Sequence, residues 1–112
     1  MLDGNDSIAL LNEAITAGLN SSALAVGDFN GVIAYLDVTS VSGTTPSMTV
    51  TMQDSPDGNT WYNIPSGAFT AVTAAGTQRL LLSNCGQYIR ASIAVTGTTP
   101  SFTTNLQVVG QR

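Results

Sequence analysis

The sequence predicts an all-β protein, an antiparallel β-sandwich of immunoglobulin-like or jelly-roll-like form, with about seven or eight strands and an N-terminal arm. Apolar and polar residues alternate along several short segments, which is the pattern of a half-buried strand. Turn-forming residues separate these segments at the spacing of about 8–12 residues that is typical of sandwiches. Only 9% of the 112 residues are charged whereas 43% are hydrophobic, so the chain has enough apolar surface to form a core.

A repeated block organises the chain. Residues 41–53, V-S-G-T-T-P-S-M-T-V-T-M-Q, return 54 positions later as residues 95–107, V-T-G-T-T-P-S-F-T-T-N-L-Q, with eight of thirteen positions identical. Each block follows another alternating segment, at 32–41 or 88–95. Because glycine and proline favour turns, each G-T-T-P-S segment is expected to be the loop of a β-hairpin that joins the two strands around it.

The N-terminal part admits two interpretations. Residues 6–18 have a candidate N-cap, apolar residues at helical spacing and a final glycine, which is typical of a short helix. The turn-like residues 18–21, followed by another alternating run, instead indicate that residues 8–16 are the first strand of a hairpin. We therefore divide the chain into an arm or first strand at 1–20 and a sandwich domain at 21–112.

The middle of the chain contains two further turn signals. Pro56-Asp57-Gly58 is a strong one, because glycine accepts positive φ and aspartate bonds its own downstream backbone. Residues 55–61, S-P-D-G-N-T-W, resemble a shortened Asp-box hairpin, and Trp61 is expected to pack in the core. Residues 70–73 and 77–82 flank the turn-like Ala74-Ala75-Gly76 and are predicted to form another hairpin.

The composition excludes most catalytic and metal-binding chemistry. The chain has no histidine, no lysine, one cysteine and one glutamate, so Ser-His-Asp and Cys-His arrangements are impossible. For the same reason we expect no metal site and no cofactor. Asp54 and Asp57 lie in one turn, where they are expected to stabilise the turn rather than act as acid and base. We therefore expect a protein that is not an enzyme.

Charge and hydropathy also limit the partners. The net charge is −4, and three arginines cannot assemble a basic groove, so we expect no nucleic-acid binding. No apolar run approaches the roughly 18 residues that a membrane helix needs, so no membrane partner is expected. No signal peptide is visible, and the unpaired Cys85 fits synthesis in a reducing cytoplasm.

Three segments of the chain carry sequence motifs that occur together, in the same order, in one group of known proteins. They are residues 31–62, with V-S-G-T-T-P-S and Q-D-S-P-D-G-N-T-W, residues 68–78, A-F-T-A-V-T-A-A-G-T-Q, and residues 88–102, with Y-I-R-A and V-T-G-T-T-P-S-F. Together they resemble a family of small β-sandwich proteins that is common in the structural gene clusters of tailed bacteriophages. The resemblance covers about residues 8–109 and favours a strand at residues 8–16.

The resemblance implies a structural virion protein, usually a capsid decoration (cement) protein on the exterior of the phage head. It would be made in the host cytoplasm, and its partners would be the major capsid protein and further copies of itself in a homotrimer. The family supplies no catalytic residues. The alternative is a carbohydrate- or receptor-binding β-module of a phage fibre or tail, which would expose aromatic residues.

Apolar residues outside the expected core are the candidate contacts of a decoration protein. Their burial between subunits would contribute about 25 cal/mol per Å². Polar, flexible residues surround apolar anchors in the arm, which suits a segment that orders on a coat subunit. The predicted capsid or subunit contacts are Leu2, Ile8, Leu10, Leu11, Ile33 and Tyr35.

Overall fold

The computed structural model describes residues 7–27, 31–83 and 86–111. This part of the chain forms seven strands that pair in an antiparallel manner. The predicted all-β, antiparallel architecture is therefore confirmed. None of the described residues form a helix long and apolar enough to cross a membrane. The strands are β1 (Ser7–Ile15), β2 (Leu19–Asn20), β3 (Leu24–Ala25), β4 (Gly31–Ser55), β5 (Tyr62–Ala68), β6 (Gly76–Ser83) and β7 (Tyr88–Gln111).

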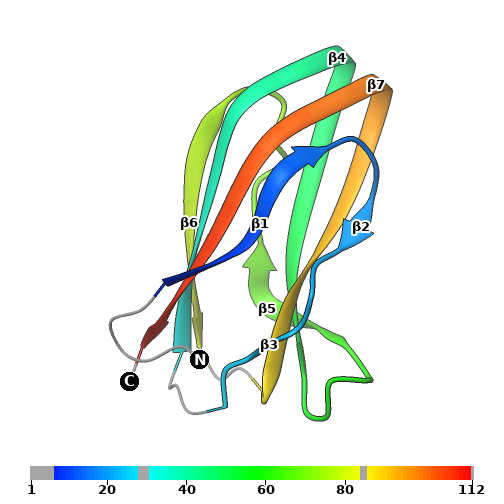
Figure 1. Ribbon diagram of the computed structural model, residues 1–112. Coiled ribbons are helices and arrows are strands. Elements are labelled where there is room, and N and C mark those ends of the chain that lie inside the picture. The colour runs from blue at the N-terminus through cyan, green and yellow to red at the C-terminus, as the bar shows by residue number, and fades with distance from the viewer. Residues whose placement is uncertain (1–6, 28–30, 84–85, 112) are drawn as a thin grey trace.

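Two very long strands build both layers of the sandwich. β4 and β7 pair from Gly31↔Gln111 to Ser55↔Tyr88, and the ribbon that they form arches over once in its middle (Figure 1). The first half of β4 and the second half of β7 lie in the first layer, where β6 pairs with β4 and β1 pairs with β7. The other two halves lie in the second layer, where β5 pairs with β4 and both β2 and β3 pair with β7.

The two G-T-T-P-S segments form this arch, so the prediction that each is a hairpin loop is wrong. Gly43 and Gly97 have φ angles of 112° and 116°, and Thr45 and Thr99 have φ angles of 46° and 45°. The two segments therefore make the same bend. One copy passes from the first layer to the second and the other copy passes back, so a local two-fold axis that exchanges the layers relates them.

Glycine is required where the two bends touch. A Cβ atom on Gly43 would lie 2.8 Å from the carbonyl oxygen of Thr99, and one on Gly97 would lie 2.8 Å from the carbonyl oxygen of Thr45. Both distances are too short for any side chain, and both glycines have positive φ. The two copies of the sequence repeat thus form two bends of the same conformation, one in β4 and one in β7.

β1 is a full member of the first layer. It pairs with β7 from Ser7↔Val109 to Ile15↔Phe102, with one irregularity in the register. The strand interpretation of this region is confirmed and the helix interpretation is wrong. β2 and β3 pair with the other half of β7, so β1 forms no hairpin with the run that follows it.

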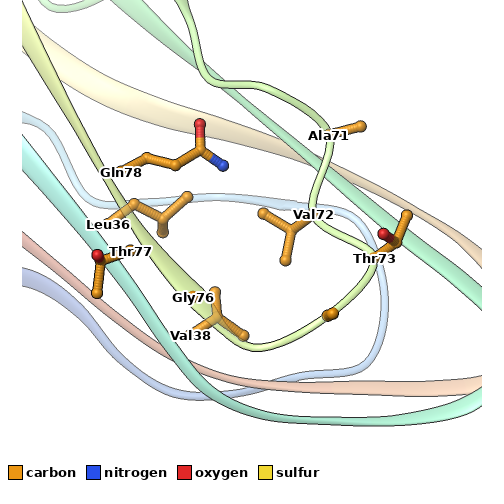
Figure 2. A pocket seen from close by; sticks show the side chains of 9 residues that line it. Leu36, Val38, Ala71, Val72, Thr73, Gly76, Thr77 and Gln78 are labelled. Atoms are coloured by element: carbon orange, nitrogen blue, oxygen red, sulfur yellow. The ribbon is translucent and has the colours of Figure 1, made fainter.

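The chain crosses from β5 to β6 through residues 69–75, along one open edge of the sandwich. Val72 exchanges two backbone hydrogen bonds with Met48, of 2.8 and 2.9 Å. The Gln78 side chain accepts from the N–H of Thr70 at 2.8 Å and donates to its carbonyl at 2.9 Å. Figure 2 shows Val72 pointing from this crossover toward the space between the layers. Because β6 pairs with β4, the predicted hairpin of 70–73 with 77–82 is wrong.

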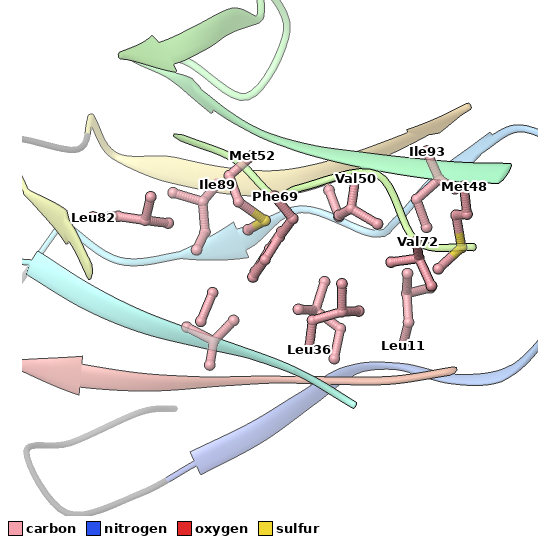
Figure 3. Close-up of a cluster of buried hydrophobic side chains, with 14 of the residues drawn as sticks. Leu11, Leu36, Met48, Val50, Met52, Phe69, Val72, Leu82, Ile89 and Ile93 are labelled. Atoms are coloured by element: carbon pink, nitrogen blue, oxygen red, sulfur yellow. The ribbon is translucent and has the colours of Figure 1, made fainter. Parts of the chain in front are cut away.

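The inward faces of both layers form a single core. Alternate residues of β4 and β7 point into it, as the period-two pattern predicted, and Figure 3 shows side chains from the two layers meeting. Crossover and edge residues complete it. The largest fully buried side chains are Phe102, Ile15, Leu36, Met48, Met52, Leu82, Ile89, Leu106, Val26, Val32 and Val38.

Candidate functional site

The outer face of the first layer carries apolar side chains across three neighbouring strands. Ile33 of β4 lies between Leu81 of β6 and Val109 of β7 in the strand register. Leu81 is 63% exposed and Val109 is half-buried, whereas Ile33 between them is buried. Leu81, Ile33 and Val109 are called the apolar row below. The exposed surface of Leu81 and of part of Val109 gains free energy when another surface covers it.

Polar and charged groups border the apolar row. Tyr35 follows Ile33 on the same face of β4, and the guanidinium carbon of Arg79 lies 5.9 Å from the centroid of its ring. Asp37 follows Tyr35, beside Asn105 of β7. The Oδ1 atom of Asn105 is buried without a hydrogen-bond partner in the described part of the chain. Among the described residues, the apolar row on this face is therefore bordered by one positive side chain, Arg79, and one negative side chain, Asp37.

The structure separates the other predicted contact residues. Leu11 belongs to the core and Leu10 packs against it, so both side chains make apolar contacts within the subunit. Ile8 lies in β1 opposite Val108, and its side chain is outside the described part of the structure. Leu2 also lies outside the described residues. Among the six predicted contacts, Tyr35 is thus the described side chain with substantial exposure, at 38%.

The outer face of the second layer carries the single tryptophan of the chain. Ile89 and Ala91 of β7 point into the core, so Arg90 between them points outward. Its guanidinium carbon lies 4.5 Å from the centroid of the Trp61 ring, a cation–π contact. Trp61 is partly exposed, so the prediction that it packs in the core is wrong.

A chain of hydrogen bonds starts at Arg90 and crosses three strands. The Nε atom of Arg90 donates to Oε1 of Gln53 at 2.9 Å, and Nε2 of Gln53 donates to Oδ1 of Asn63 at 2.9 Å. Arginine can only donate, so it fixes the orientation of the glutamine amide, which in turn fixes that of the asparagine amide. Trp61, Arg90, Gln53 and Asn63 are called the Trp61 face below.

Two side chains hold the loop that precedes Trp61. The Ser55 hydroxyl accepts from the N–H groups of Asp57 and Gly58, at 3.2 and 2.8 Å, and donates to Oδ1 of Asp57 at 3.0 Å. Oδ1 of Asp57 also accepts from the N–H groups of Asn59 and Thr60, at 2.9 and 3.0 Å. These donors, the Thr60 N–H first among them, hold the pKa of the Asp57 carboxyl below its usual value. Asp57 therefore stabilises the turn, in agreement with the turn signal in the sequence.

The Trp61 face could be found only in part from the sequence. In the run Tyr88-Ile89-Arg90-Ala91, alternation predicts an outward arginine. What it does not predict is the contact of that arginine with Trp61, because the two residues come together through pairing of strands that are distant in the sequence.

A small cavity of about 190 Å³ lies between β4, β6 and the crossover (Figure 2). Its walls are apolar at Leu36, Val38 and Val72 and carry polar groups at Thr73, Thr77 and Gln78. No titratable side chain lines it. Elsewhere in residues 7–27, 31–83 and 86–111, no three His, Cys, Asp or Glu side chains gather as metal ligands would. The cavity thus lacks an acid, base or metal ligand, and the two outer faces are the stronger candidates for binding.

Comparison with solved structures shows where the same fold occurs. The PBSX exported protein XepA matches with a TM-score of 0.69 and 15% identity, over 96% of this chain. This chain spans only 37% of the length of XepA. The SPBc2 prophage-derived protein YomS matches with a TM-score of 0.53 and 14% identity, over 92% of this chain and 90% of YomS.

A third solved structure, PirA, also has this fold. PirA has a TM-score of 0.52 and 11% identity, over 99% of this chain and 96% of its own. No protein-family model and no curated protein sequence matches the chain. At these identities the likeness concerns the fold alone: the chain shares its β-sandwich with XepA and with a prophage-derived protein.

Proposed function

We propose that the protein is a non-enzymatic structural protein of a tailed-phage virion, a decoration protein that binds the outside of the head and stabilises it. The observation that carries this proposal is the apolar row on the outer face of the first layer. Leu81 of the edge strand β6 exposes most of its side chain there, beside Ile33 of β4. In this role the row packs against the major capsid protein or against a second copy within a homotrimer.

Weak contacts are sufficient for this role. Complete burial of a leucine side chain contributes about 1.5–3 kcal/mol relative to exposure. A trimer presents each contact three times, and the effective concentration after the first contact strengthens the others without new chemistry. The apolar row itself contains no charged side chain, which keeps the cost of removing water from it small.

The fold supports the proposal. YomS is described as prophage-derived and XepA as a PBSX exported protein, and both share the fold of this chain. Leu2, which precedes β1 in the sequence, also remains a proposed contact with a coat subunit, in the manner of an arm that adds an apolar anchor to its partner. Ile8, the other predicted arm contact, lies within β1 and pairs with Val108.

Binding to heads tests the proposal directly. Heads of the phage that encodes the protein, prepared without it, are mixed with the purified protein and sedimented. We expect Leu81→Ser to weaken binding about tenfold or more, because each copy loses part of its apolar contact. Tyr62→Ser is the matched control: Tyr62 is 58% exposed but lies in β5 of the second layer. Equal binding by Leu81→Ser and wild type, or absence of the protein from purified virions, would overturn the proposal.

A second candidate function is a carbohydrate- or receptor-binding module of a fibre or tail. The Trp61 face favours it, because a partly exposed indole beside planar polar side chains is typical of sugar-binding surfaces.

A further inference from the structure

We infer that the Trp61 face binds carboxylated sugars, that is, pyranose rings that carry a carboxylate group. The inference deepens the second candidate function, on which it rests, by naming the class of ligand. It follows from three properties of the face: an indole ring for stacking, hydrogen-bond donors at both ends of a fixed chain, and a positive charge at the end of that chain beside the indole.

Trp61 supplies the stacking surface. Its ring contacts Arg90, and the residue as a whole is only partly buried, so stacking is assigned to the part of the ring that Arg90 leaves uncovered. The C–H face of a pyranose ring packs well on such a surface, because both are flat and weakly hydrated. Arg90 also holds the indole by a cation–π contact, so little side-chain entropy is lost when a ligand binds.

The polar groups of the face present mainly donors. Oε1 of Gln53 already accepts from Arg90, and Oδ1 of Asn63 already accepts from Gln53. Within the described part of the chain, the Nη atoms of Arg90 and the Nδ2 atom of Asn63 have no partner, and they lie at the two ends of the chain of hydrogen bonds. A ligand rich in acceptor oxygens matches this arrangement better than one that must also donate.

The charge selects an anion. Among the described residues Arg90 contacts Trp61 and Gln53, both neutral, so its charge is available. The nearest carboxylate in sequence to Gln53 is Asp54, and it accepts from the N–H of Gly86 at 2.9 Å. The net charge of −4 disfavours an anion in general, and this effect is screened at physiological salt over a Debye length of about 8 Å. A carboxylate can receive two parallel N–H bonds from a guanidinium, which fixes the orientation of the sugar.

The location of the face allows both proposed functions at once. The apolar row lies on the outer face of the first layer and the Trp61 face on the outer face of the second, with the core between them. A copy that rests on a coat subunit through the apolar row would therefore present the Trp61 face away from the head.

Titration of the isolated protein with defined saccharides tests the inference. Trigalacturonic acid is compared with its methyl ester, which keeps the rings but loses the charges, and 3′-sialyllactose is compared with lactose. The two pairs distinguish a uronic acid from a sialic acid as the source of the carboxylate. Trp61, as the single tryptophan, reports binding by its fluorescence, and calorimetry provides a second readout. We expect at least one acid to bind about tenfold or more tightly than its neutral counterpart, and the difference to shrink as salt is added.

Variants link the binding to this face. Trp61→Ala should abolish binding, read by calorimetry, and Arg90→Gln should remove the preference for the acid. Arg90→Lys keeps the charge but loses the two-bond fork, and should bind the acid about tenfold more weakly than wild type. Arg79→Gln is the matched control, because Arg79 lies over Tyr35 on the opposite face. Thermal unfolding of each variant confirms that it is folded.

The outcomes separate the inference from the function on which it rests. Equal binding of acid and neutral sugars would overturn the inference and keep sugar binding. Absence of saturable binding by the wild type would overturn both. An effect of Arg79→Gln as large as that of Arg90→Gln would show that net charge, rather than the Trp61 face, determines binding, and would also overturn the inference.

Discussion

At the scale of single residues, Asp57 shows how one carboxylate shapes a loop beside a binding surface. Its Oδ1 atom accepts hydrogen bonds from the Ser55 hydroxyl and from two backbone N–H groups. These hydrogen bonds, rather than apolar packing, hold the loop in shape. The loop then places Trp61 on the outer face of the second layer, where Arg90 meets it. The geometry of the Trp61 face therefore depends on an ionised group that does not belong to it.

Asp57→Asn should lower the unfolding temperature at neutral pH, and the difference from wild type should vanish in acid. The pKa of Asp57 is lower in the folded protein than its ordinary value of 3.8. The ionised carboxylate therefore stabilises the fold fully above that ordinary value, and this contribution is lost as the pH falls through the lower, folded-state pKa. Thermal unfolding of both proteins from about pH 7 to about pH 2 checks this. A difference that stayed constant down to the lowest pH would contradict the role of the charge.

At the scale of elements, the arch of β4 and β7 decides the architecture. Each long strand serves both layers, so the two layers are continuous through two bends that touch each other. A sandwich held in this way depends on the fit between the bends, in which Gly43 faces the backbone of Thr99 and Gly97 faces the backbone of Thr45.

Gly43→Ala and Gly97→Ala should each destabilise the protein by about 1–3 kcal/mol or more, because a Cβ atom would clash with backbone at a positive φ. The local two-fold axis predicts similar losses at both sites. Gly76→Ala is the control, since a Cβ atom there would meet nothing within 4 Å, and it should change the stability by about 0.5 kcal/mol or less. Free energies of unfolding in denaturant measure all three. A clear difference between the two bend variants would contradict the symmetry of the arch.

Strands were predictable from the sequence, but their partners were not. Alternation indicated strands at 32–41 and 102–109, and the structure has both within β4 and β7. Glycine and proline at 43–47 indicated a turn, but such residues are equally compatible with a hairpin loop and with a bend between two layers. The difference lies in the contact with the second G-T-T-P-S segment, which is a long-range property.

The Trp61 face was missed for a related reason. The usual preference of tryptophan for the core favoured burial of Trp61, but on the outer face the arginine supplies a cation–π contact that stabilises a partly exposed indole. The apolar row was partly foreseen, because Ile33 and Tyr35 lie on the face of β4 opposite to the core residues. Leu81, its most exposed member, joins them only through the pairing of β6 with β4.

At the scale of the whole molecule, β1 determines how the start of the chain can be used for binding. β1 covers the edge of β7 in the first layer, and its residues Leu11 and Ile15 belong to the core. Because this strand is part of the sandwich, a contact arm that can be removed without damage to the fold must lie before Ser7.

Two truncations therefore should behave differently. Deletion of residues 2–12 removes most of β1 together with Leu11, and the loss of one such buried leucine costs about 2–5 kcal/mol. It also leaves an edge of β7 unpaired, which favours self-association. Deletion of residues 2–6 leaves every pair of β1 in place. We expect the longer truncation to unfold at a much lower temperature and to aggregate, and the shorter one to unfold like the full chain.

Thermal unfolding, light scattering and sedimentation with heads compare the two truncations with the full chain. Unfolding of the longer truncation at the wild-type temperature would contradict the role of β1 in the core. The shorter truncation then tests the arm itself. If it folds normally but binds heads more weakly, Leu2 or its neighbours supply a contact with the coat protein. If it binds as tightly as the full chain, the apolar row is sufficient, because Leu81, Ile33 and Val109 are unchanged in that variant.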